Sequence, residues 1–447
     1  MTSAGRAVGD RGTAVVIGGG LAGCLAAWAL RGVAQRVVVI ERDRYPEGAD
    51  FRAGVPQGRH GHLLLEAGHR TLEELMPGAR ADLFVAGATR VPVSGALRWL
   101  SAAGWLAEYE AELAFMSCTR PVIDKVVLDR VRTEPSIEIL EGTEVVGLLG
   151  DARTVTGVRI RERGRVGAEV QHVPAELVVD AAGRGTRISR WLEDLGAQEL
   201  QEERVDAGVA YASRIYYRTP GHNLGFDAFY VQTQAPVHGR LGVLLPVEGD
   251  RWIVSMGGMR GHEPSIQAGE FEQQLAALRD PGIADVVTQA RPAGPPRGFL
   301  PGPGVWRHHE RTAPDGLVAV GDASCTFNPV YGQGMSVAAL GARALRDIVR
   351  RHQHIGPAAA RDARDAIAAV TKNPWVMSSS EDVRFPATTG GPTGRMVRTQ
   401  HRFLDRVLAR ATTDPKVTEA FHTVSSLVEP PTALFRPSVL GAVLFGG

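Results

Sequence analysis

A short apolar run followed by three consecutive glycines, close to the start of the chain, most constrains how it can fold. Residues 13–17 are largely apolar, the glycines 18–20 interrupt them, and 21–30 are rich in alanine and leucine. A second apolar run, 36–40, ends at Glu41. A strand, a glycine turn, a helix, a second strand and a terminal acid, in this order, predict a βαβ unit that binds a dinucleotide.

Each glycine of the GxGxxG spacing has a separate expected task. Gly18 permits the tight turn, Gly20 lets the backbone approach a pyrophosphate, and Gly23 lets the helix pack closely on the strand. The first helical turn, with Leu21 and Ala22, offers unpaired N–H groups and the positive end of the helix dipole to the phosphates.

The acid at the end of the second strand selects among nucleotides. Glu41 would accept hydrogen bonds from ribose hydroxyls, and Arg42 beside it is a further expected contact. Because a carboxylate here disfavours a 2′-phosphate, the tightly bound ligand is expected to be FAD or NAD rather than NADP.

A second glycine-rich segment lies in the C-terminal half of the chain. The apolar run 317–320 ends just before Asp322, and helix-forming residues resume from position 334. Asp322 can hydrogen-bond ribityl hydroxyls, and backbone N–H groups at the helix start can face the pyrimidine edge of a flavin. The residues expected at the flavin in this segment are Pro329, Gly332, Gly334 and Met335. Together the two segments predict one FAD molecule held at both ends.

The chain resembles the class A-type FAD-dependent monooxygenases of the p-hydroxybenzoate hydroxylase fold. The GDA…NPxxGQGM text of the second segment is similar to that family's GD motif. The runs FRAGVPQGRHGHLLLEAG and DAAGRGTRISRWLEDLG resemble a bacterial subgroup that includes the polyene epoxidases of polyether pathways. The resemblance covers nearly the whole chain and implies an α/β fold, α+β overall.

This resemblance implies further contacts with FAD. Arg52 would lie near the pyrophosphate, and Arg120, at the head of a helix, would reach the cofactor. Asp180 and Gly183 occupy the position of the family's DG motif, although this chain reads Asp-Ala-Ala-Gly where Asp-Gly is usual. The departure leaves the contact with nicotinamide open.

The expected organisation is a Rossmann-like FAD-binding domain interrupted by a sheet. Residues 10–204 form the first part of the FAD-binding domain and 301–355 the second. Residues 205–300 contain strand-like runs and predict a mostly antiparallel β-sheet that binds substrate. A segment at about 85–115 would also face the substrate. Residues 356–447 predict a helical C-terminal region. Its apolar tail, 438–447, could rest on a membrane surface or cap the pocket, but it is better explained by packing against the FAD-binding domain.

The aromatic side chains of the strand-like runs together predict an apolar substrate pocket, because few charged residues alternate with them. Taken singly, each of them is more simply explained as part of the sheet core. His60 and His62 are acid–base candidates because imidazole titrates near neutrality. They are better explained as residues that orient the loop beside the flavin. The residues expected to line the pocket are Trp99, Phe229, Tyr230, Trp252 and Phe327.

The resemblance implies that a flavin hydroperoxide inserts one atom of dioxygen into an apolar natural-product intermediate. The sequence shows no catalytic triad, paired carboxylates or metal-ligand cluster, which favours a cofactor that supplies the chemistry. Alkene epoxidation is expected ahead of aromatic hydroxylation. The alternatives are a flavin-dependent prenyl reductase and a redox-neutral FAD-containing cyclase or binding protein. Halogenases share the fold, but their WxWxIP segment is absent and Lys125, Lys372 and Lys416 are badly placed for their flavin lysine.

Composition excludes several other classes. A formal net charge of +1 without a basic block argues against nucleic-acid binding. Cys24, Cys118 and Cys325 offer no disulfide framework. No run of about 18 apolar residues and no signal-like N-terminus are present, so we expect a cytoplasmic protein without a transmembrane segment. Without a second GxGxxG unit, the electrons would come from NAD(P)H docking transiently or from a partner flavin reductase.

Overall fold

A parallel sheet forms the centre of the nucleotide-binding part of the molecule. The computed structural model describes residues 12–165, 167–219 and 224–445. The sheet has five strands in the order β21-β12-β1-β2-β8. Their bounds are β1 Thr13–Ile17, β2 Arg36–Glu41, β8 Ile137–Glu141, β12 Leu177–Asp180 and β21 Leu317–Ala319. The apolar runs of β1, β2, β12 and β21 are almost wholly buried because both faces of the sheet are covered, whereas the edge strand β8 is only partly buried.

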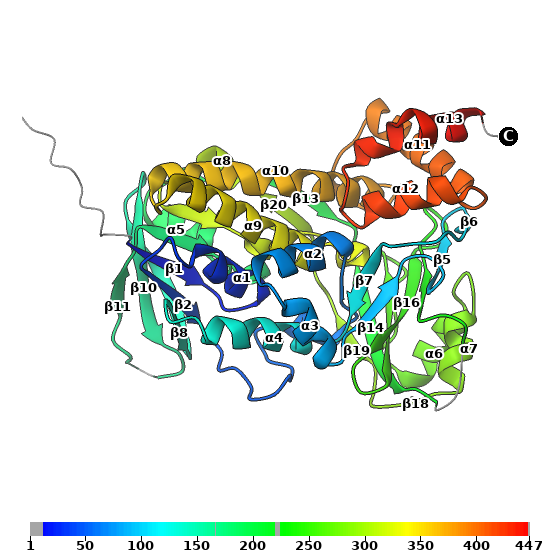
Figure 1. The fold of residues 1–447 in the computed structure, drawn as a ribbon, viewed down its shortest axis with the longest axis horizontal. Helices are drawn as coiled ribbons and strands as arrows, with labels where there is room; N and C mark the ends of the chain where they lie inside the picture. The colour runs from blue at the N-terminus through cyan, green and yellow to red at the C-terminus, as the bar shows by residue number, and fades with distance from the viewer. Residues whose placement is uncertain (1–11, 166, 220–223, 446–447) are drawn as a thin grey trace, which may run out of the picture.

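Helices cover one face of this sheet and a second, antiparallel sheet covers the other (Figure 1). Alternate residues of β1 divide between the two layers: Ala14 and Val16 pack with the helices, and Val15 and Ile17 pack with the small sheet. The helices on this side are α1 Leu21–Leu30, α2 Glu66–Leu75, α3 Ala79–Val85, α4 Arg120–Arg132, α9 Gly334–His352 and α10 Pro357–Asp382. The antiparallel strands are β9 Thr143–Gly150, β10 Val155–Glu162 and β11 Gln171–Pro174, beside α5 Ile188–Asp194.

A larger sheet lies beside the nucleotide-binding part and we call it the roof sheet. Its order is β18-β14-β17-β16-β15-β5-β6, with β19 paired to β14. The bounds are β5 Leu97–Ser101, β6 Gly104–Trp105, β14 Ala210–Tyr217, β15 Ala228–Val231, β16 Arg240–Val247, β17 Arg251–Gly258, β18 Arg291–Pro292 and β19 Arg297–Phe299. All its neighbouring strands are antiparallel except β15 and β5. One face packs on α6 Ala268–Ala276 and α7 Gly282–Thr288.

Two further sheets connect these parts. One has the order β22-β20-β13-β23 and the other β3-β7-β4. Their bounds are β3 Leu63–Leu64, β4 Thr89–Pro92, β7 Ala114–Ser117, β13 Glu202–Asp206, β20 Gly304–Arg307, β22 Cys325–Thr326 and β23 Thr389–Gly390. The short helices are η1 Pro56–Arg59, η2 Gly183–Gly185, α8 His309–Thr312, η3 Gly321–Ala323 and η4 Pro329–Tyr331. The observed fold is therefore mixed α/β, as the sequence predicts.

The last helices form a separate C-terminal lobe above the roof sheet (Figure 1). It consists of α11 Arg395–Ala411, α12 Pro415–Ser425, η5 Pro431–Phe435 and α13 Pro437–Phe445. Val439 of α13 packs with Val407 of α11 and Val417 of α12. The expectation that the apolar tail packs on the FAD-binding domain is therefore wrong, because the lobe has its own apolar core.

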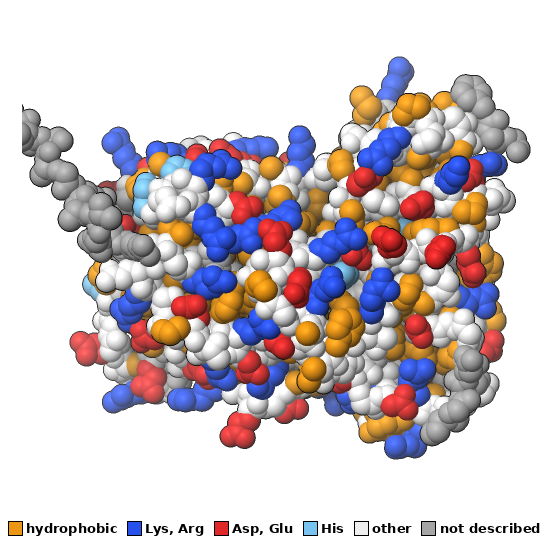
Figure 2. Space-filling view, viewed as in Figure 1, with side chains coloured by type: hydrophobic (Ala, Val, Ile, Leu, Met, Phe, Trp, Pro, Cys, Tyr) orange, Lys and Arg blue, Asp and Glu red, His pale blue; other side chains and the backbone are white. Residues whose placement is uncertain are grey.

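The visible surface carries basic and acidic side chains interspersed with one another (Figure 2). Within the described ranges, no helix combines the length and apolar character needed to cross a bilayer. The same residues contain no group of three or more His, Cys, Asp or Glu side chains that could hold a metal ion.

Candidate active site

One large cavity joins the two glycine-rich segments to the roof sheet and the C-terminal lobe. Its volume is about 990 Å³. Pockets for drug-sized ligands usually measure about 300–1,000 Å³, so this cavity lies at the upper end of the range. Its lining runs from the β1–α1 turn, past the start of α9, to apolar side chains of the roof sheet and lobe. The cavity therefore has a polar end at the glycine segments and, continuous with it, an apolar end that we call the apolar chamber, lined by side chains such as Trp99, Leu245 and Phe421.

The first glycine segment forms one end of this cavity. Gly18 has a φ of +96°, and a Cβ there would lie 2.6 Å from the Ala181 carbonyl oxygen. A Cβ on Gly23 would lie 1.8 Å from the Gly18 carbonyl oxygen. Gly20 differs because its nearest neighbour would be Arg52 Nη2 at 3.9 Å. Gly18 and Gly23 are thus required by the protein's own packing, whereas Gly20 keeps the cavity open, and Leu21 and Ala22 line it beside Gly20.

Glu41 and Arg52 form a buried charged pair at the same end. Glu41 Oε2 accepts from the Gly19 N–H at 2.8 Å, and Oε1 accepts from the Asp43 N–H at 2.8 Å. Arg52 Nη1 lies 3.2 Å from Glu41 Oε1 but makes no hydrogen bond of good geometry. These contacts hold the carboxylate at the end of β2, and its remaining lone pairs face a cavity that Arg42 also lines.

Asp180 lies behind the cavity wall, and its side chain does not line the cavity. Its oxygens accept from the Ala182 N–H at 3.0 Å and from Thr186 Oγ1 at 2.5 Å. Burial raises the pKa of Asp180. The predicted direct contact with FAD is replaced by support of the turn, since both oxygens bond to the turn itself. Gly183, with a φ of +72°, and Arg184 do line the cavity.

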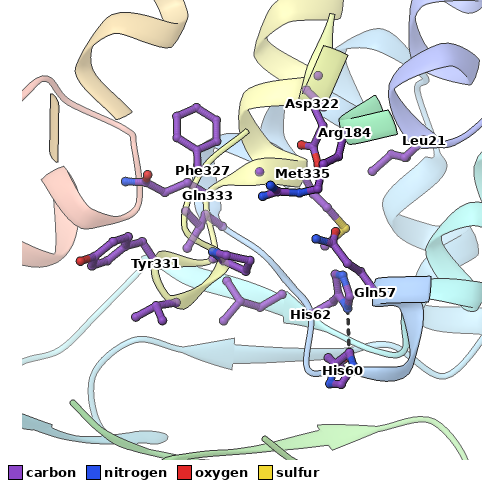
Figure 3. A pocket seen from close by; sticks show the side chains of 18 of the residues that line it. Leu21, Gln57, His60, His62, Arg184, Asp322, Phe327, Tyr331, Gln333 and Met335 are labelled. Atoms are coloured by element: carbon purple, nitrogen blue, oxygen red, sulfur yellow. Dashed lines mark hydrogen bonds between the residues drawn. The ribbon is translucent and has the colours of Figure 1, made fainter. Parts of the chain in front are cut away.

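The second glycine segment meets the first at Gly321. Gly321 has a φ of +58°, and a Cβ there would lie 2.6 Å from the Cβ of Ala22. Asp322 is directed into the cavity near Arg184, as the close view shows (Figure 3). Burial raises the pKa of Asp322, while Arg184 and Arg120 oppose that rise. Arg120 lines the cavity as well, so the cations implied by the family resemblance gather at this end.

The loop before α9 provides backbone rather than charge. Pro329, Gly332, Gly334 and Met335 all line the cavity. Helix α9 begins at Gly334 without a side-chain cap, so its first N–H groups remain available to a ligand. Gln333 Oε1 is buried without a hydrogen-bond partner (Figure 3). This helix start therefore suits the polar edge of a bound flavin.

His60 and His62 line the cavity below this loop, and both are neutral near pH 7. His60 Nδ1 lies 2.8 Å from Ser213 Oγ, and His62 Nδ1 lies 2.9 Å from the His60 carbonyl oxygen (Figure 3). Burial lowers the pKa of His60 to about 4 and that of His62 to about 3. Cationic Arg59 and Arg120 act in the same direction. The hydrogen bonds of His60 and His62 therefore favour a role in positioning this loop, and not a role as charged proton donors.

Strand alternation divides the predicted substrate residues. Trp99, Tyr230 and Phe327 line the cavity. Phe229 and Trp252 do not, because they point to the opposite face of the roof sheet and pack against α6 and α7. Tyr230 adjoins Phe229 in β15, so only one of them can face the cavity. The prediction for Phe229 and Trp252 is therefore wrong.

Sequence reasoning missed the contribution of the C-terminal lobe. Phe403, Leu404 and Leu408 of α11 line the chamber, with Phe421 of α12 and Leu434 of η5. The amphipathic spacing of α11 was the available signal, but a helical stripe does not say which surface it covers. The lobe closes the apolar end of the cavity.

The buried polar atoms that lack a hydrogen bond in the cavity lining fit FAD. Arg52 Nη1, Arg184 Nε and Gln333 Oε1 are all buried without hydrogen-bond partners, and all three side chains line the cavity. Two uncapped helix starts, at α1 and α9, face the same space. A cofactor with a pyrophosphate in one part and a polar ring edge in another could form hydrogen bonds with these side-chain atoms and with the N–H groups of both helix starts. Fold and site together define a flavin-dependent oxidoreductase.

Comparisons with known proteins agree with this class. A family described as FAD dependent oxidoreductase matches residues 14–188. The protein Rv3254 of Mycobacterium tuberculosis is 31% identical over 446 residues, covering 95% of this chain and 91% of that protein. The 6-methylpretetramide 4-monooxygenase of Streptomyces rimosus is 25% identical over 358 residues, covering 75% of this chain and 73% of the enzyme.

Among solved structures, the flavin-dependent brominase Bmp2 is similar with a TM-score of 0.68 and 14% identity, covering 93% of each chain. At that identity the likeness shows the fold, which flavin-dependent monooxygenases and halogenases share. The chain belongs to the same family as protein Rv3254, and its residues 14–188 match the family described as FAD dependent oxidoreductase.

Proposed function

We propose that the protein is an FAD-dependent monooxygenase that transfers one atom of dioxygen to an apolar natural-product intermediate, most readily to an alkene carbon pair as an epoxide. The observation that carries the proposal is the continuity of the cavity. Its charged end has the features that FAD requires, and its other end is an apolar chamber closed by the roof sheet and the lobe. When bound and reduced, the flavin supplies the activation of dioxygen.

The chain's own residues bind, orient and exclude water. Arg52, Glu41 and the uncapped start of α1 would hold the pyrophosphate and ribose, and Asp322 would hold the ribityl chain. The start of α9 would stabilise negative charge on the reduced ring. Side chains such as Leu245 and Phe421 would keep water from the reacting carbon.

Epoxidation fits a chamber without a strong base at its apolar walls. The reaction adds oxygen across a double bond and needs no proton removed from carbon. His60 and His62 are consistent with this, because burial lowers their pKa values to about 4 and about 3 and so makes both imidazoles weak bases.

Aromatic hydroxylation is the second candidate, favoured by one specific contact. Tyr331 lines the cavity, and its hydroxyl donates to Asp382 at 2.9 Å. A phenolic substrate could pass its proton toward this pair. The similarity to 6-methylpretetramide 4-monooxygenase supports the same class of chemistry.

Halogenation receives less support from the site. Among the described residues that line the cavity none is a lysine, the residue that the resemblance to halogenases would require. The electron donor is proposed to be NADPH, either docking directly or acting through a partner reductase. Reduction of the FAD-loaded protein by NADPH in a stopped-flow instrument, with and without an added reductase, separates these routes.

Oxygen labelling tests the proposed function. Candidate polyenes and phenols are incubated with the FAD-loaded protein, NADPH, a general flavin reductase and labelled dioxygen. We expect one labelled atom in the product, as an epoxide or a phenol. Label that enters only from water, or the same product formed anaerobically, would exclude a monooxygenase and favour a redox-neutral cyclase or a reductase.

A further inference from the structure

The apolar chamber differs from the cofactor end of the cavity in its charge. The arginines that line the cavity are Arg42, Arg52, Arg120, Arg184 and Arg187. All of them lie on the segments expected to hold FAD. Of the described residues that the roof sheet and the C-terminal lobe contribute to the lining, none is arginine or lysine.

Helix α10 contributes an acidic side chain, and no basic one, to the lining of the cavity. Glu381, at the end of α10, lines the cavity and accepts from Arg384 Nε at 2.9 Å. His401 of α11 also lines it, and burial lowers its pKa with help from Arg384. An anionic substrate would therefore lose its hydration without gaining a cationic partner, which is costly in an apolar site.

One buried donor in the wall of the chamber has no hydrogen-bond partner. Tyr211 of β14 lines the cavity and is buried, and its hydroxyl oxygen makes no hydrogen bond within the protein. Its ring packs with Phe299 of β19 and Val330 of η4, so the side chain is held in place. Burial raises the pKa of Tyr211 well above its ordinary value, and the nearby Tyr230 and Asp382 contribute. The hydroxyl thus remains a donor at neutral pH.

The neighbouring polar groups are already engaged. Ser213 and Ser255, on the same face of the roof sheet, bond to each other at 2.6 Å and hold His60 and the Gly61 N–H. Tyr331 donates to Asp382. The Tyr211 hydroxyl is thus the donor on this face that lacks an acceptor, and a buried polar group without a partner calls for an explanation.

We propose that the substrate is an uncharged, largely hydrocarbon molecule with a hydroxyl or carbonyl oxygen that accepts a hydrogen bond from Tyr211 Oη. The inference rests on the proposed function, because only an enzyme has a substrate, but it concerns the binding of that substrate and not its oxidation. It excludes aromatic carboxylates as substrates and makes Tyr211 the residue that selects the orientation of the substrate.

The test measures binding to the oxidised, FAD-loaded protein at pH 7.5, without an electron donor. The probes are 2-naphthol, naphthalene and 2-naphthoate, which share the ring system and differ in the oxygen function and charge. Titration calorimetry and the change in flavin absorbance give the dissociation constants. We expect 2-naphthol to bind at least about tenfold more tightly than 2-naphthoate, because the anion has no partner.

Substitution separates the hydrogen bond from the shape of the chamber. Tyr211→Phe should raise the dissociation constant of 2-naphthol by about three- to tenfold and leave that of naphthalene unchanged, as expected for the loss of one hydrogen bond. Tyr217→Phe is the matched control, since Tyr217 lies in the same strand but is exposed beneath Arg291 and should leave all three constants unchanged. FAD content and unfolding temperature are compared for both variants.

Several outcomes overturn the inference: equal or tighter binding of 2-naphthoate, no binding of the neutral probes, or unchanged 2-naphthol binding in Tyr211→Phe. Because no turnover is involved, the result is independent of oxygen labelling. Selective binding of the neutral probes without any labelled product would support this inference and exclude the monooxygenase proposal. A labelled product without selective binding of the neutral probes would exclude this inference and support the monooxygenase proposal.

Discussion

The Tyr331 hydroxyl donates a 2.9 Å hydrogen bond to Asp382 and thereby joins the second glycine segment to the end of α10. The same Oδ1 atom of Asp382 accepts from Asn328 Nδ2 at 2.6 Å. Asn328 also accepts from the Val330 N–H at 3.1 Å through its own side-chain oxygen. The loop beside the flavin site is therefore held by a buried carboxylate from another helix.

The first prediction follows from the charge of that carboxylate. Burial raises the pKa of Asp382 from 3.8 to about 7. The folded protein then holds a proton that the unfolded chain releases, so the stability contributed by this group is complete below about pH 4 and is lost as the pH rises through about 7. We expect the free energy of unfolding of the wild type to fall relative to that of Asp382→Asn between pH 4.5 and 7.5, measured by urea titration. Parallel pH profiles for the two proteins would contradict this.

The second prediction separates two glycines of one motif. In Gly23→Ala the new Cβ would meet the Gly18 carbonyl oxygen at 1.8 Å, so we expect the free energy of unfolding to fall by at least about 1–3 kcal/mol, with or without FAD. In Gly20→Ala the Cβ has room within the protein but enters the cavity, with Arg52 Nη2 nearest at 3.9 Å. That variant should keep the stability of the apoprotein and lose FAD affinity. Equal stability losses in the apoproteins would argue against this division of tasks.

The third prediction tests how β15 divides its side chains. Phe229 is 2% exposed and packs against α7, so Phe229→Ala should cost about 3–5 kcal/mol of unfolding free energy. Tyr230 lines the cavity, and Tyr230→Leu should change stability by less than about 1.5 kcal/mol while weakening 2-naphthol binding. Denaturant titration and calorimetry measure the two effects. The reverse pattern would mean that the strand faces the other way.

The fourth prediction concerns the two neutral histidines. Their pKa values, about 4 for His60 and about 3 for His62, lie below the ordinary 6.5, so the unfolded chain binds protons that the folded protein excludes. Their contribution to stability is complete above pH 6.5 and is lost as the pH falls through about 4. We expect neither ring to titrate between pH 5.5 and 8 in histidine NMR spectra. His60→Gln and His62→Gln identify the two signals, and a midpoint near 6.5 for either would refute the assignment.

The nucleotide-binding half of the fold could be predicted from the sequence because its key interactions join residues that are close in sequence. The glycines 18, 20 and 23 and the acid at 41 each have a steric or hydrogen-bonding reason that acts within one βαβ unit. Asp180 shows where such reasoning stops. Its sequence position predicts a ligand contact, but the Thr186 hydroxyl, six residues later, donates to Asp180 in place of the cofactor.

The chamber was harder to predict because its walls come from distant segments. Alternation along β15 assigns Phe229 and Tyr230 to opposite faces, yet the sequence does not state which face meets the cavity. The lobe that closes the chamber packs through contacts such as Trp99 on Phe421, with ring centroids 5.4 Å apart. Pairings across such separations in sequence leave no local pattern.

The order of strands in the nucleotide-binding sheet has a consequence for how the chain is made. Strand β21 at residues 317–319 closes the sheet beside β12, whereas the other four strands are complete by residue 180. A ribosome therefore releases the whole roof sheet before the edge of the first sheet can be paired. The nascent chain must carry an open, apolar strand edge through that interval, when chaperones or early FAD capture would protect it from aggregation.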